Sequence, residues 1–205
     1  SAKVHPGALG RILSHIHFGS TLNIAASLAH PCRPTMGLRG VYTEKLLAKS
    51  AEVMRSIGYK RGLVVHGRDE KTGLGMDEIS LSGKTTIHEF FGSAHHEYTM
   101  CPEDAGVRRE PFEAVASLGD PKKEAQRFVQ VLSGRGHDAC IDFTCLNAGA
   151  VLYTAGICPD IKAGVHVSRA AIEKGAVIEK LSQWVNIQGH PDGKGRQRLE
   201  SLLER

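Results

Sequence analysis

The chain has 205 residues, of which 41% are hydrophobic and 23% are charged, a balance that is typical of a folded domain and excludes a largely disordered chain. The net charge of +4 permits phosphate-bearing ligands but is too small to indicate nucleic-acid binding by itself. No apolar run approaches the roughly 18 residues that a membrane span needs, and the start lacks the apolar segment of a signal peptide.

The first 65 residues predict a helical segment followed by a strand–helix–strand unit. Apolar residues share one helical face over 9–16, and a short strand is expected over 38–42. Thr43 precedes an amphipathic pattern that Gly58 ends, as is usual for a helix. The next strand begins at Leu63, so we expect a βαβ unit with parallel strands and a right-handed crossover.

The chain from 61 to 83 contains the first candidate site. The run Leu63–Val65 is continuously apolar, which is typical of a strand buried on both faces. It ends at His66 and is followed by a polar, glycine-rich loop, and we expect the chain to re-enter a strand over 79–81. Asp77 and Glu78 lie at that re-entry point. Ligands of open α/β sheets collect where loops leave the carboxyl ends of buried strands, which makes this loop the candidate.

The remainder predicts two polar strands and a run of helices. The strands are expected over 85–91 and 97–100, antiparallel at one edge of the sheet. The expected helices begin at Asp120, Asp138, Asp160 and Val177 and end near Gly134, Gly156, Gly175 and Gly189. Together the elements predict an α/β domain over 1–189, with a central mixed, mostly parallel sheet flanked by helices and a helical C-terminal third. A polar tail follows at 190–205, and its apolar residues Leu199, Leu202 and Leu203 leave a frayed helix open as an alternative.

Five cysteines, an odd number, include no Cys-x-x-Cys pair, and Cys140, Cys145 and Cys158 fall inside helical patterns. Such a set favours reduced, mostly buried thiols. We therefore expect a cytoplasmic protein.

Two motifs of nucleotide-binding and zinc proteins are incomplete in this chain. The segment 82–85 resembles the end of a P-loop, but the glycine required five residues before Gly83 is replaced by Glu78. The segment His95–Glu97 lacks a second histidine at the spacing of a zinc motif. We therefore reject both a triphosphate-binding P-loop and a zinc site of this type.

Asp77 and Glu78 remain as a candidate metal site. At a loop-to-strand junction, neighbouring carboxylates can face one cavity and hold a hard divalent cation, whereas spacing alone also permits a solvated acidic turn. For His66, a hydrogen-bonded structural role stands beside a role in a site. Arg108 and Arg109 can receive phosphate or a partner carboxylate.

An ordered series of short motifs also runs through the chain: His5-Pro6, Leu28-Ala29-His30-Pro31, Leu38-Arg39-Gly40-Val41-Tyr42, Val64-Val65-His66-Gly67, Asp77-Glu78-Ile79-Ser80, Pro102-Glu103-Asp104-Ala105-Gly106 and Leu146-Asn147-Ala148-Gly149. In this order, the set resembles the C-terminal part of the anthranilate phosphoribosyltransferases, over about residues 5–188. The resemblance implies an α/β domain with a central mixed sheet, preceded in that family by a small N-terminal helical domain.

The resemblance also implies a function. It implies Mg²⁺-dependent transfer of phosphoribose from phosphoribosyl pyrophosphate to the amine of anthranilate, in tryptophan biosynthesis. By position, Asp77 and Glu78 match the pair that binds Mg²⁺ and, through it, the pyrophosphate. His5 matches a histidine of the anthranilate channel, and His66 is held as a residue of the site wall. The family's dimer contacts lie largely in the helical domain, so a homodimer is expected only for a full-length protein.

Two departures from the family limit this expectation. The family's Gly-Thr-Gly-Gly-Asp loop and Lys-His-Gly-Asn segment lie upstream of His5 and do not occur here, so we expect a fragment that is inactive alone. His15 stands where the family has an arginine for the anthranilate carboxylate, which leaves the acceptor amine open. The alternative is a non-catalytic homologue that binds nucleic acid through basic residues. These are Arg33, Arg39, Arg108, Arg109 and the tail residues Lys194, Arg196 and Arg198.

Overall fold

The computed structural model describes residues 28, 30, 32–189 and 192–204. His5, His15 and the first predicted helix lie outside the described residues. The elements follow one another in the order β1 (Met36–Gly40), η1 (Glu44–Leu46), α3 (Leu47–Ser56), β2 (Arg61–Arg68), β3 (Gly75–Met76), β4 (Thr85–Phe91), β5 (Ala94–Met100), η2 (Pro102–Ala105), η3 (Phe112–Ala114), α4 (Pro121–Leu132), α5 (Asp138–Thr154), α6 (Ile161–Glu173), α7 (Ala176–Gln188) and α8 (Lys194–Leu203).

Strand β2 forms the centre of the sheet. The strand order is β1-β2-β4-β5, and β3 pairs with the end of β2. β1 runs parallel to β2, with Leu38 opposite Leu63, and α3 connects the two strands, so the predicted βαβ arrangement is confirmed. Leu63 and Val65 belong to one hydrophobic cluster and Val64 to the other. β2 is therefore buried on both faces, as its apolar run predicts.

The sheet is mixed and flanked by helices, as expected, but its parallel share is smaller than the predicted "mostly parallel". Among the described strands, the β1–β2 pairing is parallel and the other three pairings are antiparallel. For β4 and β5, the reason is the length of their connection. Only two residues join β4 to β5, and a connection this short can join strands only in the antiparallel sense.

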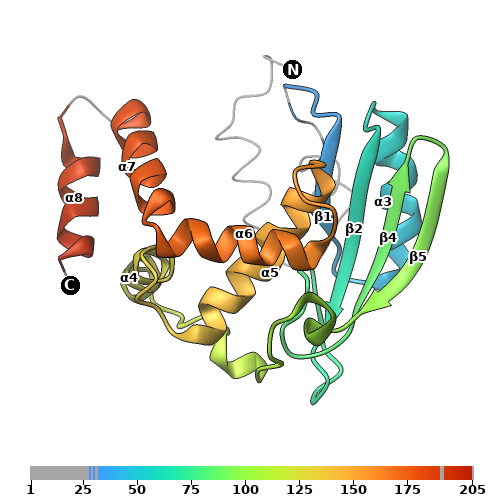
Figure 1. Cartoon of the computed structure of the whole chain (residues 1–205), viewed down its shortest axis with the longest axis horizontal. Helices are drawn as coiled ribbons and strands as arrows, with labels where there is room; N and C mark the ends of the chain where they lie inside the picture. Colours follow the sequence, from blue (N-terminus) through green and yellow to red (C-terminus); the bar gives the residue numbers. More distant parts are fainter. Residues whose placement is uncertain (1–27, 29, 31, 190–191, 205) are drawn as a thin grey trace, which may run out of the picture.

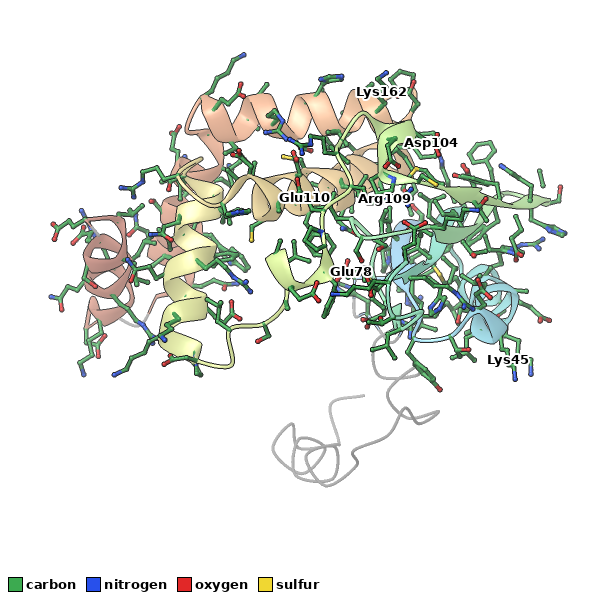
Figure 2. The ribbon with its side chains drawn as sticks, turned by 90° about the horizontal axis from the view of Figure 1, so that it is seen from below. Lys45, Glu78, Asp104, Arg109, Glu110 and Lys162 are labelled. Atoms are coloured by element: carbon green, nitrogen blue, oxygen red, sulfur yellow. The ribbon has the colours of Figure 1, made fainter. Side chains whose placement is uncertain are left out.

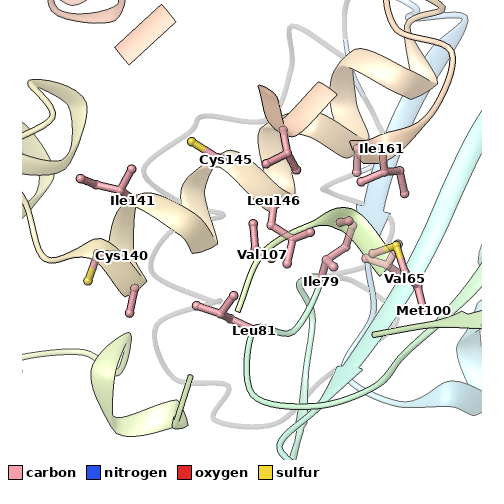
Figure 3. Packing of buried hydrophobic residues seen from close by; sticks show 14 of the residues in the cluster. Val65, Ile79, Leu81, Met100, Val107, Cys140, Ile141, Cys145, Leu146 and Ile161 are labelled. Atoms are coloured by element: carbon pink, nitrogen blue, oxygen red, sulfur yellow. The ribbon is translucent and has the colours of Figure 1, made fainter. Parts of the chain in front are cut away.

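Helices cover both faces of the sheet (Figure 1). On one face, Leu47 and Met54 of α3 pack with Val64 and Phe90. On the other face, α5 lies over the sheet, and its Leu146 shares a cluster with Val65, Ile79 and Leu81 (Figure 3). Helix α6 crosses α5 closely, because Gly149 and Gly164 let the two backbones touch.

The helical C-terminal third is confirmed. Asp120 accepts hydrogen bonds from the first backbone N–H groups of α4, and Asp160 accepts one from Ala163 in α6, as their predicted capping roles require. His137 rather than Asp138 caps α5. In the described part of the chain, no helix is long and apolar enough to cross a membrane.

The predicted polar tail contains helix α8. Its Leu199 is buried, and the Leu203 carbonyl accepts a hydrogen bond of 2.8 Å from Arg135, which follows α4. α8 packs against α4 and α7. The apolar residues of the tail thus lie on one face of helix α8.

Candidate active site at the carboxyl ends of β1 and β2

A compact turn returns the chain to the sheet after β2. The Asp69 carboxylate accepts hydrogen bonds from the backbone N–H (2.9 Å) and the hydroxyl (2.6 Å) of Thr72, and the Asp69 carbonyl accepts one from Gly73. The bond from the Thr72 hydroxyl, above all, lowers the pKa of Asp69. β3 then pairs with the last residues of β2, with Met76 opposite Gly67. The next two residues, Asp77 and Glu78, are thereby placed at the carboxyl end of β2.

Two glycines let the backbone of this acidic pair lie directly on the sheet. A Cβ atom at Gly40, the last residue of β1, would overlap the carbonyl oxygen of Asp77. A Cβ atom at Gly67 in β2 would lie 2.5 Å from the carbonyl oxygen of Glu78. Only residues without a side chain permit such an approach. The pair therefore sits across the carboxyl ends of two neighbouring parallel strands, where the sequence predicts a site.

The segment after the pair is anchored by side chains and is not the predicted strand over 79–81. The backbone N–H of Ile79 donates to Asn147 Oδ1 (2.9 Å), and Asn147 Nδ2 donates back to the Ile79 carbonyl (3.1 Å). The N–H of Ser80 donates to Thr85 Oγ1. These bonds replace strand pairing, while Ile79 and Leu81 are buried in the core. The alternating apolar residues Ile79 and Leu81 therefore belong to a buried loop and not to the predicted strand.

The two carboxylates form an exposed, like-charged pair. Both Asp77 and Glu78 are exposed residues. Partial burial of its carboxyl group, and then the neighbouring charge of Asp77, raise the pKa of Glu78. Arg39 on β1 interacts electrostatically with Asp77. Burial lowers the pKa of Arg39, and the charges of Tyr59 and Asp77 oppose that shift. Figure 2 shows Glu78 between the sheet and the helical part of the chain.

This donor set fits Mg²⁺ better than a metal that needs an all-protein cage. In the described ranges, no three His, Cys, Asp or Glu side chains gather in a way that could hold a metal ion. Mg²⁺ usually keeps several waters and takes only one or two carboxylates together with substrate phosphates. A divalent cation also relieves the repulsion between the two neighbouring carboxylates.

His66 is buried beside the site. Its Nδ1 lies 2.8 Å from the carbonyl oxygen of Val41, and only 4% of the residue is exposed. A Cβ atom at Gly75 would overlap the imidazole ring, so the ring packs against β3. These contacts correspond to the hydrogen-bonded structural role. Contact of His66 with a substrate stays a prediction.

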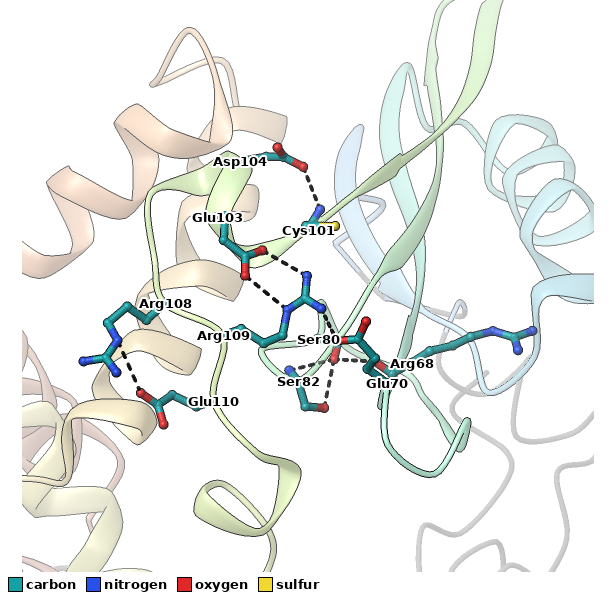
Figure 4. Close-up of polar contacts among 10 residues, drawn as sticks. All are labelled: Arg68, Glu70, Ser80, Ser82, Cys101, Glu103, Asp104, Arg108, Arg109 and Glu110. Atoms are coloured by element: carbon teal, nitrogen blue, oxygen red, sulfur yellow. Dashed lines mark hydrogen bonds and ion pairs between the residues drawn. The ribbon is translucent and has the colours of Figure 1, made fainter.

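Ion pairs tie the turn after β2 to the segment that follows β5. Arg109 pairs with Glu103 and with Glu70 (Figure 4), and Lys71 pairs with Glu113 at 3.0 Å. The bonds to Glu103 and then Glu70 raise the pKa of Arg109. Of the two partners expected for Arg109, phosphate or a carboxylate, the structure therefore shows carboxylates, those of Glu70 and Glu103.

Residues 7–178 match the family described as "Glycosyl transferase family, a/b domain". The chain belongs to this family. An anthranilate phosphoribosyltransferase from Rubrobacter xylanophilus is 33% identical over 197 residues, which are 95% of this chain and 56% of that protein. The crystal structure of the anthranilate phosphoribosyltransferase from Thermus thermophilus has a TM-score of 0.74 and 30% identity, over 86% of this chain and 50% of that one.

A Saccharomyces cerevisiae anthranilate phosphoribosyltransferase in complex with PRPP and Mg is also similar. Its TM-score is 0.72, and the match covers 88% of this chain and 50% of that one. At 22% identity this likeness concerns the fold alone. The glycosyl transferase domain described here thus spans about half the length of the relatives it matches.

Three contributors to the site of this glycosyl transferase domain were not identified as such from the sequence. They are Gly40, Gly67 and Asn147, which were noted only as parts of motifs. Their roles depend on contacts between distant segments; Asn147 and Ile79 are 68 positions apart. One signal for Asn147 was available, since it is an amide within an otherwise apolar stretch of a predicted helix.

The basic residues of the nucleic-acid alternative are spread over the described structure. Arg39 is half-buried in β1, and the tail residues lie on α8, at the far end of the molecule from the sheet (Figure 1). Lys194 pairs with Asp192 at 3.0 Å and Arg196 with Glu200 at 2.8 Å. The basic residues of α8 therefore lie apart from Arg39, and nucleic-acid binding stays a prediction.

Proposed function

We propose that this chain provides the Mg²⁺ and phosphoribosyl pyrophosphate site of an anthranilate phosphoribosyltransferase-like enzyme, with Asp77 and Glu78 as the metal-binding carboxylates. The observation that carries the proposal is the placement of this pair across the carboxyl ends of β1 and β2, which Gly40 and Gly67 permit. The names of the relatives at about one-third identity support the reaction class.

The proposed reaction is a displacement at the anomeric carbon of the ribose. The bond from that carbon to the pyrophosphate oxygen breaks, a bond from the amine nitrogen of anthranilate forms, and the nitrogen loses one proton. Mg²⁺, when bound, supplies positive charge that stabilises the negative charge growing on the departing pyrophosphate. The contribution of this chain is to hold two carboxylates at the carboxyl ends of β1 and β2.

Other features of the enzyme belong to the same proposal. We place His5 at the anthranilate channel and His66 in the wall of the site. Because the relatives are about twice as long as the matched part, we propose that catalysis also requires the N-terminal helical domain and the glycine-rich loop of that family. In this proposal, the helical domain also carries most contacts of a homodimer. We place the reaction in the cytoplasm, with anthranilate or a related amine as acceptor.

The test is a calorimetric titration with phosphoribosyl pyrophosphate, with and without Mg²⁺. It uses the longest native polypeptide that contains these 205 residues. The parent should bind only with Mg²⁺. The Asp77→Ala, Glu78→Ala double variant should lose more than about 100-fold in affinity, since even changes to the residues that support metal ligands cost about 10–100-fold.

The control removes the same charge elsewhere. Glu52 on α3 and Glu179 on α7 are exposed, and the Glu52→Ala, Glu179→Ala double variant should bind like the parent. Mg²⁺-independent binding by the parent, or equal binding by the Asp77 and Glu78 variant, would contradict the proposal.

A further inference from the structure

Asn147 connects helix α5 to the loop that carries the acidic pair. Its side-chain amide makes three hydrogen bonds. Oδ1 accepts from the Ile79 N–H at 2.9 Å, Nδ2 donates to the Ile79 carbonyl at 3.1 Å, and Nδ2 also donates to the Phe143 carbonyl at 3.1 Å. The last bond lies within α5 and fixes the orientation of the amide. The first two then hold both backbone groups of one loop residue.

This two-point contact substitutes for a neighbouring strand. In a sheet, a residue exchanges an N–H and a carbonyl with one partner residue, and the Asn147 amide offers Ile79 the same acceptor and donor. Ile79 is also fully buried among the core residues. The peptide that follows Glu78 is therefore held by helix α5 as well as by the core.

On its other side, the backbone of the acidic pair packs directly against the sheet. The Asp77 carbonyl lies against Gly40, and the Glu78 carbonyl lies against Gly67. The backbone of the pair thus sits between glycines of β1 and β2 and the Ile79 peptide that Asn147 holds. Of these contacts, Asn147 supplies the directional hydrogen bonds.

We propose that Asn147 is a positioning residue for the metal site: it sets the position of the Asp77 and Glu78 carboxylates without touching the metal or the substrate. This inference rests on the proposed function. Outer residues of this kind orient metal ligands, and their loss typically lowers metal affinity about 10–100-fold. We expect a loss in this range when the Asn147 amide is removed.

The experiment compares Asn147→Ala with Thr154→Val. Thr154 lies on the same helix, is buried, and donates only to the Ala150 carbonyl. Both variants lose buried hydrogen bonds of α5, so both should have lower melting temperatures. Only Asn147→Ala should raise the Mg²⁺ concentration needed for half-maximal binding of phosphoribosyl pyrophosphate, by about 10–100-fold.

A second readout does not involve the metal. Hydrogen exchange of the Ile79 amide, measured without ligand, should accelerate in Asn147→Ala and remain at the parent rate in Thr154→Val. If Asn147→Ala does not fold, Asn147→Ser takes its place, because its short hydroxyl cannot reach both backbone groups of Ile79.

The outcomes separate the two claims. A parent that shows no Mg²⁺-dependent binding overturns the proposed function and, with it, this inference. A parent that binds with Mg²⁺ while Asn147→Ala keeps the same Mg²⁺ requirement overturns the inference alone. Faster Ile79 exchange with an unchanged Mg²⁺ requirement would likewise reduce Asn147 to a structural residue.

Discussion

Gly40 determines how closely the acidic pair approaches β1. Because a Cβ atom at this position would overlap the Asp77 carbonyl, Gly40→Ala must displace the backbone of the pair. We expect Gly40→Ala to lower the free energy of unfolding by about 1–3 kcal/mol, the usual cost of overpacking, and to weaken Mg²⁺-dependent binding. Chemical denaturation and the calorimetric titration measure the two effects.

Gly37 on the same strand provides the control. A Cβ atom there would lie 2.8 Å from the edge of the Tyr59 ring, which can shift, rather than from backbone. Gly37→Ala should therefore cost less stability and leave binding unchanged. Equal effects of the two substitutions would show that the approach of Asp77 to Gly40 has no special role.

A second residue-scale feature is the cluster of phenols around Glu89. Tyr98 and Tyr153 donate to the two carboxylate oxygens of this buried glutamate, at 3.1 and 2.7 Å. Burial, and then Glu89, raise the pKa of both phenols above the ordinary value of about 10. Their contribution to stability is therefore complete below pH about 10 and is lost as the pH rises through the raised values.

This predicts an alkaline decline in stability that depends on the two phenols. The midpoint of denaturant unfolding should fall above pH about 10 in the parent, and less so in the Tyr98→Phe, Tyr153→Phe double variant. Tyr42 is exposed, so Tyr42→Phe should decline like the parent. A double variant with the full parental decline would show that other groups cause it.

At the same scale, the sequence predicted where the candidate pair lies but not the residues that position it. The place of Asp77 and Glu78 after a buried strand and a glycine-rich loop could be predicted, whereas their role as metal ligands comes from the family resemblance and stays a prediction. The contact of Asn147 could not be predicted, although its amide stands out in an apolar helical stretch: its partner Ile79 lies 68 positions away, and neither pattern nor propensity predicts which loop a helix contacts.

At the scale of elements, the crossing of α5 and α6 depends on glycine. A Cβ atom at Gly164 would overlap the Gly149 carbonyl oxygen, and one at Gly149 would lie 2.7 Å from the Val165 nitrogen. Gly164→Ala should push the helices apart and lower the free energy of unfolding by about 1–3 kcal/mol or more. Thermal and denaturant unfolding measure this loss.

The matched substitution is Gly195→Ala in α8. Its Cβ atom would meet only the Val185 side chain, at an ordinary 3.7 Å. Alanine is the better helix former by about 0.5–1 kcal/mol, so this variant should be as stable as the parent or more stable. Destabilisation by Gly195→Ala equal to that of Gly164→Ala would contradict the packing argument.

The sequence predicted most elements correctly, and its errors have physical causes. The βαβ unit and the four helices of the last third follow from strong periodicity and capping residues. The strand expected over 79–81 is a loop because Asn147 and Thr85 bond its backbone in place of a strand. Helix α8 was predicted only as an open alternative, a frayed helix, because its apolar positions are few; its packing on α4 and α7 explains them.

At the scale of the whole molecule, the candidate site lies at the carboxyl ends of β1 and β2 and is contacted from two sides. β1 and β2 provide the glycines, and α5 provides the amide that holds the following peptide. The chain covers about half the length of the relatives it matches. Under the proposed function, this part of the enzyme positions Mg²⁺ and pyrophosphate.

The most direct test of this account is the position of the metal. Crystals of the longest native polypeptide, grown with phosphoribosyl pyrophosphate and Mn²⁺ in place of Mg²⁺, would locate the ion by its anomalous scattering. We expect a peak within about 2.5 Å of a carboxylate oxygen of Asp77 or Glu78, in contact with the pyrophosphate. Pyrophosphate and Mn²⁺ bound away from both carboxylates would contradict the account.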